Sequence, residues 1–216
     1  MLFRDRKDAA LQLAAELGKI KGQHPLVLAI PRGGVPMGRS IADAIDGELD
    51  IILVRKLRAP GNPEFAVGAV DEGGVMQVAD HAASVGANNR YLAHEKEAQM
   101  TVMRQRRKAY TPLRTPVNPA GRTVVVVDDG LATGATMMAA LNMLRQSKPA
   151  RLICAVPVAS PESLRKVGAL ADETICLSAP KDFQSVGQFY QDFPQVEDEE
   201  VIIALQSRSD NHTESE

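Results

Sequence analysis

Residues 124–136 read VVVVDDGLATGAT and decide the fold of this chain. The four valines at the start are an apolar run typical of a strand that is buried on both faces of a parallel sheet. Two acids, Asp128 and Asp129, follow where that strand would end, and a turn of small residues comes next. From Met137 onward, apolar residues recur at intervals of three and four, which predicts a helix. The stretch therefore predicts a strand, an acidic pair, a tight turn and a helix start.

The same turn has the chemistry of a phosphate-binding site. Backbone N–H groups at a helix N-terminus, together with the helix dipole, bind phosphate. Gly134 lets the backbone approach a ligand closely, and the hydroxyls of Thr133 and Thr136 can add donors. The carboxylates of Asp128 and Asp129 can accept hydrogen bonds from a ribose diol or hold magnesium through water. This combination suits a phosphorylated sugar, and an ordinary helix cap after an acidic strand end is the alternative.

A second strand, glycine turn and helix precede this motif in the chain. Residues 26–36 read LVLAIPRGGVP, an apolar run followed by a glycine turn, and a helical pattern covers residues 37–45. The guanidinium of Arg32 offers a fork of donors to phosphate oxygens, and Gly33 and Gly34 would expose backbone N–H groups. Alone, this turn could be a simple helix entry, but beside the first motif it predicts a second anion site.

Two cations follow the next apolar segment. Residues 49–54 predict a strand, and Arg55 and Lys56 come directly after it. Cations at the carboxyl end of a parallel strand face the crevice in which open α/β sheets bind ligands. We therefore expect both side chains at the anion site, and a solvated charged pair is the alternative.

Together these motifs resemble the phosphoribosyl pyrophosphate (PRPP) signature of type I phosphoribosyltransferases, in which an apolar strand and two acids precede small residues around Thr-Gly-x-Thr. The segments PRGGVPMG, LVRKLRAPGNPEFAVGAV and VGQFY are similar to those of a bacterial group of this family with no settled substrate. The resemblance covers about residues 3–205. It implies transfer of the 5-phosphoribosyl group of PRPP to a nitrogenous acceptor, such as a nucleobase, with release of pyrophosphate and Mg²⁺ as the cofactor.

The resemblance also implies roles for single residues. It places Asp128 and Asp129 at the ribose hydroxyls, as catalytic residues that would also hold Mg²⁺ through water. The 5′-phosphate would be bound by Ala132, Thr133, Gly134, Ala135 and Thr136. The pyrophosphate would be bound by Arg32, Gly33, Gly34, Arg55 and Lys56. Ala132 stands where the hypoxanthine-guanine branch carries an aspartate, so the turn ATGAT is nearer to the adenine-branch turn ATGGT.

The alternation of strands and helices predicts an α/β fold, with a mainly parallel, twisted sheet flanked by helices. We expect one phosphoribosyltransferase-like domain over residues 1–206. By analogy with the family, residues 57–78 would be a flexible loop and hairpin, with residues 57–66 as a lid over the site. Residues 179–206 would form a small C-terminal hood ending in a helix, and residues 207–216 a disordered tail.

Two clusters have no single interpretation. Four aromatic residues lie within eleven positions, Phe183, Phe189, Tyr190 and Phe193. They would either stack on the acceptor or seal the open edge of the core. The basic run RQRRK, residues 104–108, ends a predicted helix of residues 88–110. It is a solvated helix end, a source of arginines, Arg106 or Arg107, for the site of a neighbouring subunit, or a nucleic-acid contact, which is the least favoured of the three.

Composition limits the remaining classes of protein. The chain has 216 residues, of which 44% are hydrophobic and 24% charged, as in ordinary globular domains. A net charge of −2 gives no electrostatic case for binding nucleic acid. No apolar run is long enough for a signal peptide or a membrane span, and Cys154 and Cys176 lie in apolar runs typical of reduced core residues. We expect a cytoplasmic homodimer whose partners are PRPP and a small-molecule acceptor.

Two other functions fit parts of the sequence. A PRPP- or nucleotide-binding regulator that has lost catalysis would keep the same motifs. A receiver-type phosphotransfer protein would use Asp128 and Asp129 as its phosphoacceptor cluster, but that function leaves the glycine turns at residues 31–36 and 130–136 unexplained. The patterns G-x-x-x-x-G-K-[ST] and G-x-G-x-x-G are both missing from the sequence, which counts against a P-loop and a dinucleotide site.

Overall fold

A computed structural model describes residues 2–112 and 115–206 of the chain, with the backbone alone at residues 63 and 64. The expected tail at residues 207–216 lies outside the described residues. A five-stranded sheet with the order β2-β1-β6-β7-β8 forms the core, and every neighbouring pair of its strands is parallel. Its strands are β1 (Leu26–Ala29), β2 (Glu48–Ile51), β6 (Thr123–Val127), β7 (Arg151–Val158) and β8 (Glu173–Ser178).

The valine run forms the centre of this sheet. Val124 and Val126 belong to the hydrophobic cluster on one face, whereas Val125 and Val127 belong to the cluster on the other face. All four side chains are 0% exposed, because helices cover both faces. This arrangement explains why β6 is apolar at consecutive positions, and it confirms the predicted class of a parallel α/β sheet flanked by helices.

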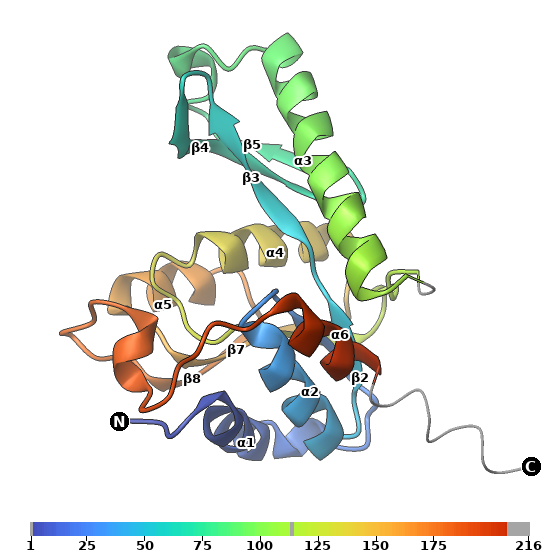
Figure 1. Ribbon diagram of the computed structural model, residues 1–216, viewed down its shortest axis with the longest axis vertical. Coiled ribbons are helices and arrows are strands. Elements are labelled where there is room, and N and C mark those ends of the chain that lie inside the picture. The colour runs from blue at the N-terminus through green and yellow to red at the C-terminus, as the bar shows by residue number, and fades with distance from the viewer. Residues whose placement is uncertain (1, 113–114, 207–216) are drawn as a thin grey trace, which may run out of the picture.

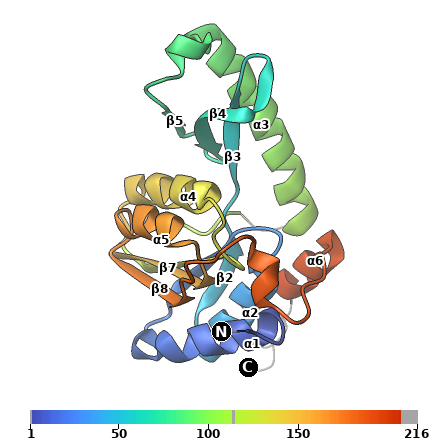
Figure 2. The same ribbon diagram turned by 90° about the vertical axis from the view of Figure 1, so that its left-hand side faces the viewer.

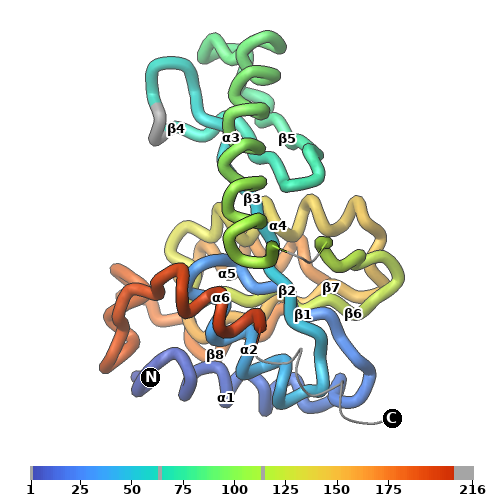
Figure 3. Tube along the Cα trace, turned by 45° about the vertical axis from the view of Figure 1, so that its right-hand side comes forward, coloured from blue at the N-terminus to red at the C-terminus, as the bar shows by residue number. Residues whose placement is uncertain are grey.

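The helices form two layers around the sheet (Figure 1). The helix α1 (Arg6–Glu16) packs on α2 (Gly34–Ala44), and both lie on the face that holds the side chains of Val125 and Val127. On the opposite face, α4 (Ala135–Gln146) packs against α5 (Pro161–Gly168). The last helix, α6 (Asp198–Gln206), contacts α2 and α3, and Figure 3 shows it in red beside the foot of the long α3.

Residues 54–110 form an arm that rises from the core above α4 (Figures 1 and 2). It contains an antiparallel sheet with the order β3-β4-β5, made by β3 (Val54–Ala59), β4 (Asn62–Asp71) and β5 (Met76–Val78). The long helix α3 (Asn89–Tyr110) packs against β3 and β4. Short 3₁₀ turns occur at Gly18–Ile20, Ala83–Val85 and Val186–Phe189.

Residues 57–66 of the arm do not form the irregular loop that we expected there. That segment forms the paired ends of β3 and β4, with Ala59 opposite Asn62. Gly61 lies in the turn between them and has a φ of 70°, a conformation that glycine adopts without steric cost. Leu57 and Val67 are fully buried, so this segment has an apolar face of its own. The proline and glycine residues therefore mark a hairpin turn, and the loop prediction was wrong for residues on either side of it.

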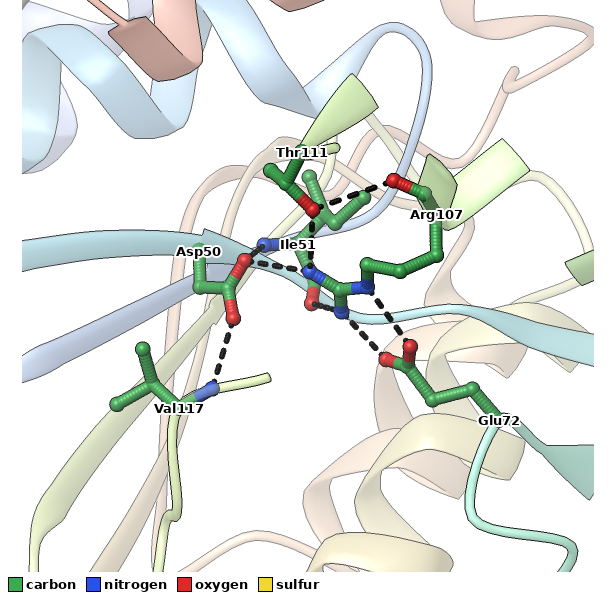
Figure 4. Close-up of polar contacts among 6 residues, drawn as sticks. All are labelled: Asp50, Ile51, Glu72, Arg107, Thr111 and Val117. Atoms are coloured by element: carbon green, nitrogen blue, oxygen red, sulfur yellow. Dashed lines mark hydrogen bonds and ion pairs between the residues drawn. The ribbon is translucent and has the colours of Figure 1, made fainter. Parts of the chain in front are cut away.

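A buried ionic network joins the arm to the core (Figure 4). From α3, Arg107 donates to Asp50 of β2 at 2.7 Å, to the carbonyl of Ile51 at 2.9 Å and to Glu72 at 2.8 Å. Asp50 also accepts from the backbone N–H of Val117 at 3.0 Å. Burial works to lower the pKa of Arg107, but Glu72 and Asp50 outweigh that effect and raise it. Arg107 is therefore neither a solvated helix end nor free to reach another subunit.

Two further features of the described chain bear on the sequence-based expectations. Cys154 is buried and Cys176 is half-buried, and both are free thiols. Within residues 2–112 and 115–206, no helix combines the length and the apolar character that a membrane span requires.

Candidate functional site

The two predicted glycine and acid motifs meet at one place in the fold. Asp128 and Asp129 follow β6, and the neighbouring strand β1 leads into the turn that contains Gly33 and Gly34. A Cβ atom on Gly33 would lie 2.0 Å from Oδ2 of Asp129, and one on Gly34 would lie 2.7 Å from the carbonyl oxygen of Val127. A side chain at Gly34 would collide with the backbone at the end of β6, and one at Gly33 would have to displace the carboxylate of Asp129.

The turn after the acidic pair ends at the N-terminus of α4. Gly134 precedes the helix in a left-handed conformation with a φ of 69°. The hydroxyl of Thr133 accepts from the N–H of Ala135 at 3.4 Å, and both Thr133 and Thr136 are exposed. The first N–H groups of a helix have no partner within the helix. Backbone hydrogen-bond donors and the positive end of the helix dipole therefore coincide at the N-terminus of α4.

Two serines of the neighbouring helix hold this turn from behind. The hydroxyls of Ser160 and Ser163 both donate to the carbonyl of Ala132, at 3.0 and 2.7 Å. Ser163 is only 3% exposed, and its Cβ lies 3.3 Å from where a side chain on Gly134 would begin. Sequence reasoning found Ser160 only as a helix cap and missed Ser163, because their contact with the turn spans about thirty residues of chain.

A second residue that the sequence analysis missed is Arg6. Its Nε and Nη2 atoms donate to the same oxygen of Asp129, at 3.0 and 2.9 Å, and its Nη1 donates to the carbonyl of Pro194 at 2.7 Å. The guanidinium carbon lies 3.8 Å from the centre of the Phe193 ring. Tyr190 adds a hydrogen bond of 2.7 Å from its hydroxyl to the carbonyl of Asp129. Asp129 is therefore held by Arg6, near the start of the described chain, and by Tyr190, near its end.

Burial makes the acidic pair difficult to ionise completely. Burial, and then the neighbouring Asp129, raise the pKa of Asp128 well above its usual value. Burial also raises the pKa of Asp129, although Arg6 acts in the opposite direction. Two adjacent carboxyl groups with raised pKa values favour a cation or several hydrogen-bond donors as ligands, because either would stabilise the charged form.

The predicted cations lie on two sides of the acidic pair. Nη1 of Arg32 lies 3.4 Å from Glu197 and 3.6 Å from Asp198, at the start of α6. Arg55 belongs to β3 in the arm, not to the end of a core strand, and its Nε donates to Gln99 at 2.5 Å. Lys56 is exposed and lines a cavity of about 380 Å³ between the arm and α4.

Arg106 joins Arg55 on the arm side of the site. Both line a small cavity of about 30 Å³ together with Pro31 and Thr136, which come from the two glycine turns. Burial lowers the pKa of Arg55, and Arg106 adds to the effect. Arg106 is exposed, and within the described residues its side chain takes part in no hydrogen bond or ion pair. The contribution of Arg106 to the site of a neighbouring subunit stays a prediction, and in its own chain Arg106 lies beside Pro31 and Thr136.

A larger cavity lies on the other side of the acidic pair, under the C-terminal segment. Its volume is about 400 Å³. It is lined by Arg6, Arg32, Gly33, Asp129, Phe193, Pro194, Gln195 and Val196.

The C-terminal aromatic residues pack mainly on one another. The rings of Tyr190 and Phe193 stack at 4.6 Å, and those of Phe183 and Phe189 stack at 5.4 Å. Phe3 from the N-terminus adds a tilted contact with Tyr190 at 5.5 Å. Because Tyr190 and the Arg6 guanidinium both contact the Phe193 ring, these residues seal the edge of the core.

The fold and this site define an α/β protein with a turn suited to phosphate beside paired acids. A family model described as the phosphoribosyl transferase domain matches residues 3–194, so the chain belongs to the phosphoribosyltransferase family.

Three relatives extend this result. The crystal structure of the protein TT1426 from Thermus thermophilus is 46% identical, with a TM-score of 0.87 over 96% of this chain and 99% of that one. A Mycobacterium tuberculosis (strain H37Rv) protein named "Putative phosphoribosyl transferase Rv0571c" is 37% identical over 94% of this chain and 46% of its own length. The uracil phosphoribosyltransferase of Myxococcus xanthus is 33% identical over 60% of this chain and 52% of its own. The chain thus spans about half the length of the curated relatives it matches.

Proposed function

We propose that this protein transfers the 5-phosphoribosyl group of PRPP to a nitrogenous acceptor and releases pyrophosphate. The observation that carries the proposal is the direct packing of Gly33 against Asp129, where a Cβ atom would lie 2.0 Å from the carboxylate. That contact gathers the anion-binding turn and the acidic pair into one site, and a ligand with a sugar between two phosphate groups needs both.

Each part of PRPP can then be assigned to a set of residues. The 5′-phosphate binds to the turn formed by Ala132, Thr133, Gly134, Ala135 and Thr136. The ribose hydroxyls donate to Asp128 and Asp129, and Arg6 fixes the carboxylate of Asp129 through two hydrogen bonds of 3.0 and 2.9 Å. The pyrophosphate binds to Arg32, Gly33, Gly34, Arg55 and Lys56, and Arg106 adds a cation on the arm side.

The chemistry needs binding and charge stabilisation more than covalent help from the protein. The bond from the anomeric carbon to pyrophosphate breaks, the acceptor nitrogen forms the new bond with its lone pair, and its proton passes to water. Cations around the leaving group stabilise the negative charge that develops on it, and fixed geometry replaces a random encounter. The arm and the C-terminal segment flank the site on opposite sides and would limit the access of water.

Magnesium fits the donors that are present. Among the described residues, no group of three or more His, Cys, Asp or Glu side chains could hold a metal ion by itself. Mg²⁺ usually keeps several waters and uses one or two carboxylates together with substrate phosphates, and the paired Asp128 and Asp129 match that requirement through water. When bound, the ion would neutralise charge on the pyrophosphate. We further propose that the protein works in the cytoplasm as a homodimer, without nucleic acid or membrane as a partner.

The alternative is a PRPP- or nucleotide-binding regulator that has lost catalysis. The ion pair between Arg6 and Asp129 favours it, because a ribose diol would have to share that carboxylate with a guanidinium. A pyrophosphate-release assay with Mg²⁺–PRPP, over a panel of nucleobases and small amines, separates the two functions. Release with one acceptor supports the transferase, whereas PRPP binding without release from any acceptor supports the regulator.

A further inference from the structure

We propose that Gln99 and Glu95 are positioning residues, which orient Arg55 toward the pyrophosphate and keep its positive charge available to that ligand. The inference rests on the proposed function, because it takes Arg55 as a pyrophosphate ligand and adds two side chains that act through it. Both side chains belong to α3 in the arm, outside the turns and strand ends to which the sequence analysis assigned the site.

The inner face of α3 carries two polar residues where a packed helix usually carries apolar ones. The buried residues of this helix are Leu92, Glu95, Gln99, Met103 and Tyr110, which recur at helical spacing. Glu95 is 6% exposed and Gln99 is 2% exposed. Packing alone does not require polar side chains here, since a buried polar group costs free energy unless it is hydrogen-bonded. The groups that these two side chains bind therefore indicate their role.

A chain of hydrogen bonds runs from Glu95 through Gln99 to Arg55. Oε1 of Glu95 accepts from Nε2 of Gln99 at 2.9 Å, and Oε1 of Gln99 accepts from Nε of Arg55 at 2.5 Å. Because a carboxylate only accepts hydrogen bonds, Glu95 fixes which end of the amide faces Arg55.

This chain leaves the far end of the guanidinium free for a ligand. Among the described residues, Nη1 and Nη2 of Arg55 have no hydrogen-bond partner, and the only bonded nitrogen of the guanidinium is Nε. Arg55 also lines the small cavity that it shares with Pro31 and Thr136 from the two glycine turns. Gln99 thus holds one edge of a fork whose two terminal nitrogens can bind phosphate oxygens.

The carboxylate of Glu95 is paired with a different arginine. Its Oε1 accepts from the backbone N–H of Arg58 at 3.2 Å and from Nε of Arg58 at 2.8 Å, where the pairing of β3 with β4 is irregular. Burial works to raise the pKa of Glu95, but hydrogen bonds from Arg58 and Gln99 outweigh it and lower that pKa. Glu95 is therefore charged, and the neutral amide of Gln99 stands between its charge and Arg55.

The resulting charge distribution suits an anionic ligand. Arg55, Arg58 and Arg106 lie near one another with Glu95 as the acid beside them, a formal surplus of two positive charges. Burial lowers the pKa of Arg55, and Arg106 and Arg58 add to the effect, so the charged form of Arg55 would be stabilised by a negative ligand. A carboxylate at position 99 would take up this charge, whereas an amide orients the guanidinium and leaves the charge in place.

An exchange of the two side chains tests the inference with the same chemical groups. The double variant Glu95→Gln, Gln99→Glu keeps one amide, one carboxylate and a hydrogen bond between them, but it places the negative charge against Arg55. Calorimetric titration would compare Mg²⁺–pyrophosphate with ribose 5-phosphate, whose phosphate is assigned to residues 132–136. We expect the Kd for pyrophosphate to rise about tenfold and the Kd for ribose 5-phosphate to change less than about twofold. A network with a purely structural role would leave both Kd values unchanged.

A single variant keeps the inference testable if the double variant does not fold. Gln99→Met keeps the length of the side chain but removes the amide, so Arg55 loses its fixed orientation. We expect the Kd for pyrophosphate to rise about threefold, again without a matching change for ribose 5-phosphate. The matched control is Glu97→Gln with Gln105→Glu, which moves a negative charge between two exposed positions of the same helix. It should leave both Kd values within about twofold of those of the unchanged chain.

The outcomes separate this inference from the proposed function. Unchanged pyrophosphate affinity in the folded double variant or in Gln99→Met, or an equal loss in the control, would overturn the inference alone. If the unchanged chain binds neither Mg²⁺–pyrophosphate nor Mg²⁺–PRPP, the proposed function fails, and the inference fails with it.

Discussion

Arg6 donates two hydrogen bonds, of 3.0 and 2.9 Å, to one carboxylate oxygen of Asp129, which lies 123 residues further along the chain. The pair joins the first residue of α1 to the acidic pair at the end of β6. Through Nη1 the same side chain holds the carbonyl of Pro194 at 2.7 Å. One arginine thus connects the N-terminal helix, the proposed ribose site and the C-terminal segment.

The raised pKa of Asp128 predicts a conflict between stability and binding. Its folded-state pKa lies above its unfolded-state pKa. The folded protein therefore loses stability as the pH rises from the unfolded-state pKa to the folded-state pKa. Asp128→Asn should therefore increase the free energy of unfolding at pH 7 by about 0.5–2 kcal/mol while weakening the binding of PRPP. Thermal unfolding from pH 4 to 7 measures this, and the gain should shrink toward low pH. Asp43→Asn, at an exposed position, is the control, and an equal gain there would contradict the explanation.

The hydroxyl of Ser163 should matter for phosphate binding although it lies behind the turn. Ser163→Ala removes a hydrogen bond of 2.7 Å to the carbonyl of Ala132. Because such a bond contributes about 0.5–1.5 kcal/mol, we expect the Kd for ribose 5-phosphate to rise about threefold to tenfold. Ser40→Ala is the matched control, since its hydroxyl bonds the carbonyl of Pro36 at 3.2 Å within α2. Equal Kd values for the two variants would mean that the turn holds its shape without Ser163.

The buried network at the base of the arm should dominate stability. Arg107→Met leaves Asp50, which is 1% exposed, without its cation. Removing one partner of a buried ion pair costs about 3–5 kcal/mol, and urea unfolding should show a loss of that size. Arg104→Met removes an arginine from the same helix, but its pair with Glu97 is exposed and should contribute less than about 1 kcal/mol. Similar losses in the two variants would contradict the structural role of Arg107.

Arg106 should contribute to the affinity for pyrophosphate and contribute little to stability. Arg106→Gln removes the unpaired cation that shares a cavity with Arg55, Pro31 and Thr136 in the described part of the chain. We expect the Kd for pyrophosphate to rise about tenfold, as for the loss of a charge-assisted contact, with little change in stability. Lys108→Gln removes the same charge from the same basic run and serves as the control. The assignment fails if the two variants lose equal affinity for pyrophosphate.

The sequence was informative where function depends on neighbouring residues. A run of valines ending in Asp128 and Asp129 favours a buried strand with acids at its end, and adjacent parallel strands then bring residues 31–34 to the same edge. Contacts between distant segments left no such local pattern. Arg6 is one of several charged residues near the N-terminus, and nothing in its neighbourhood distinguishes it before the chain folds.

The arm shows a different kind of error. Proline and glycine at residues 60–63 mark the two-residue turn of a hairpin, but their density also resembles an irregular loop. The burial of Leu57 and Val67 depends on their packing within the arm, which short alternating segments do not reveal. In the same way, the three arginines of residues 104–108 look alike in sequence and acquire different surroundings only when Asp50, Glu72 and the site lie around α3.

The most direct test of the central claim is a calorimetric titration of the unchanged chain with Mg²⁺–PRPP, beside the double variant Asp128→Asn, Asp129→Asn. If the acidic pair binds the ribose between two phosphate-binding turns, the unchanged chain should bind saturably at one site. The double variant should remain folded and lose at least tenfold in affinity. No binding to the unchanged chain, or equal affinity in both proteins, would contradict the account.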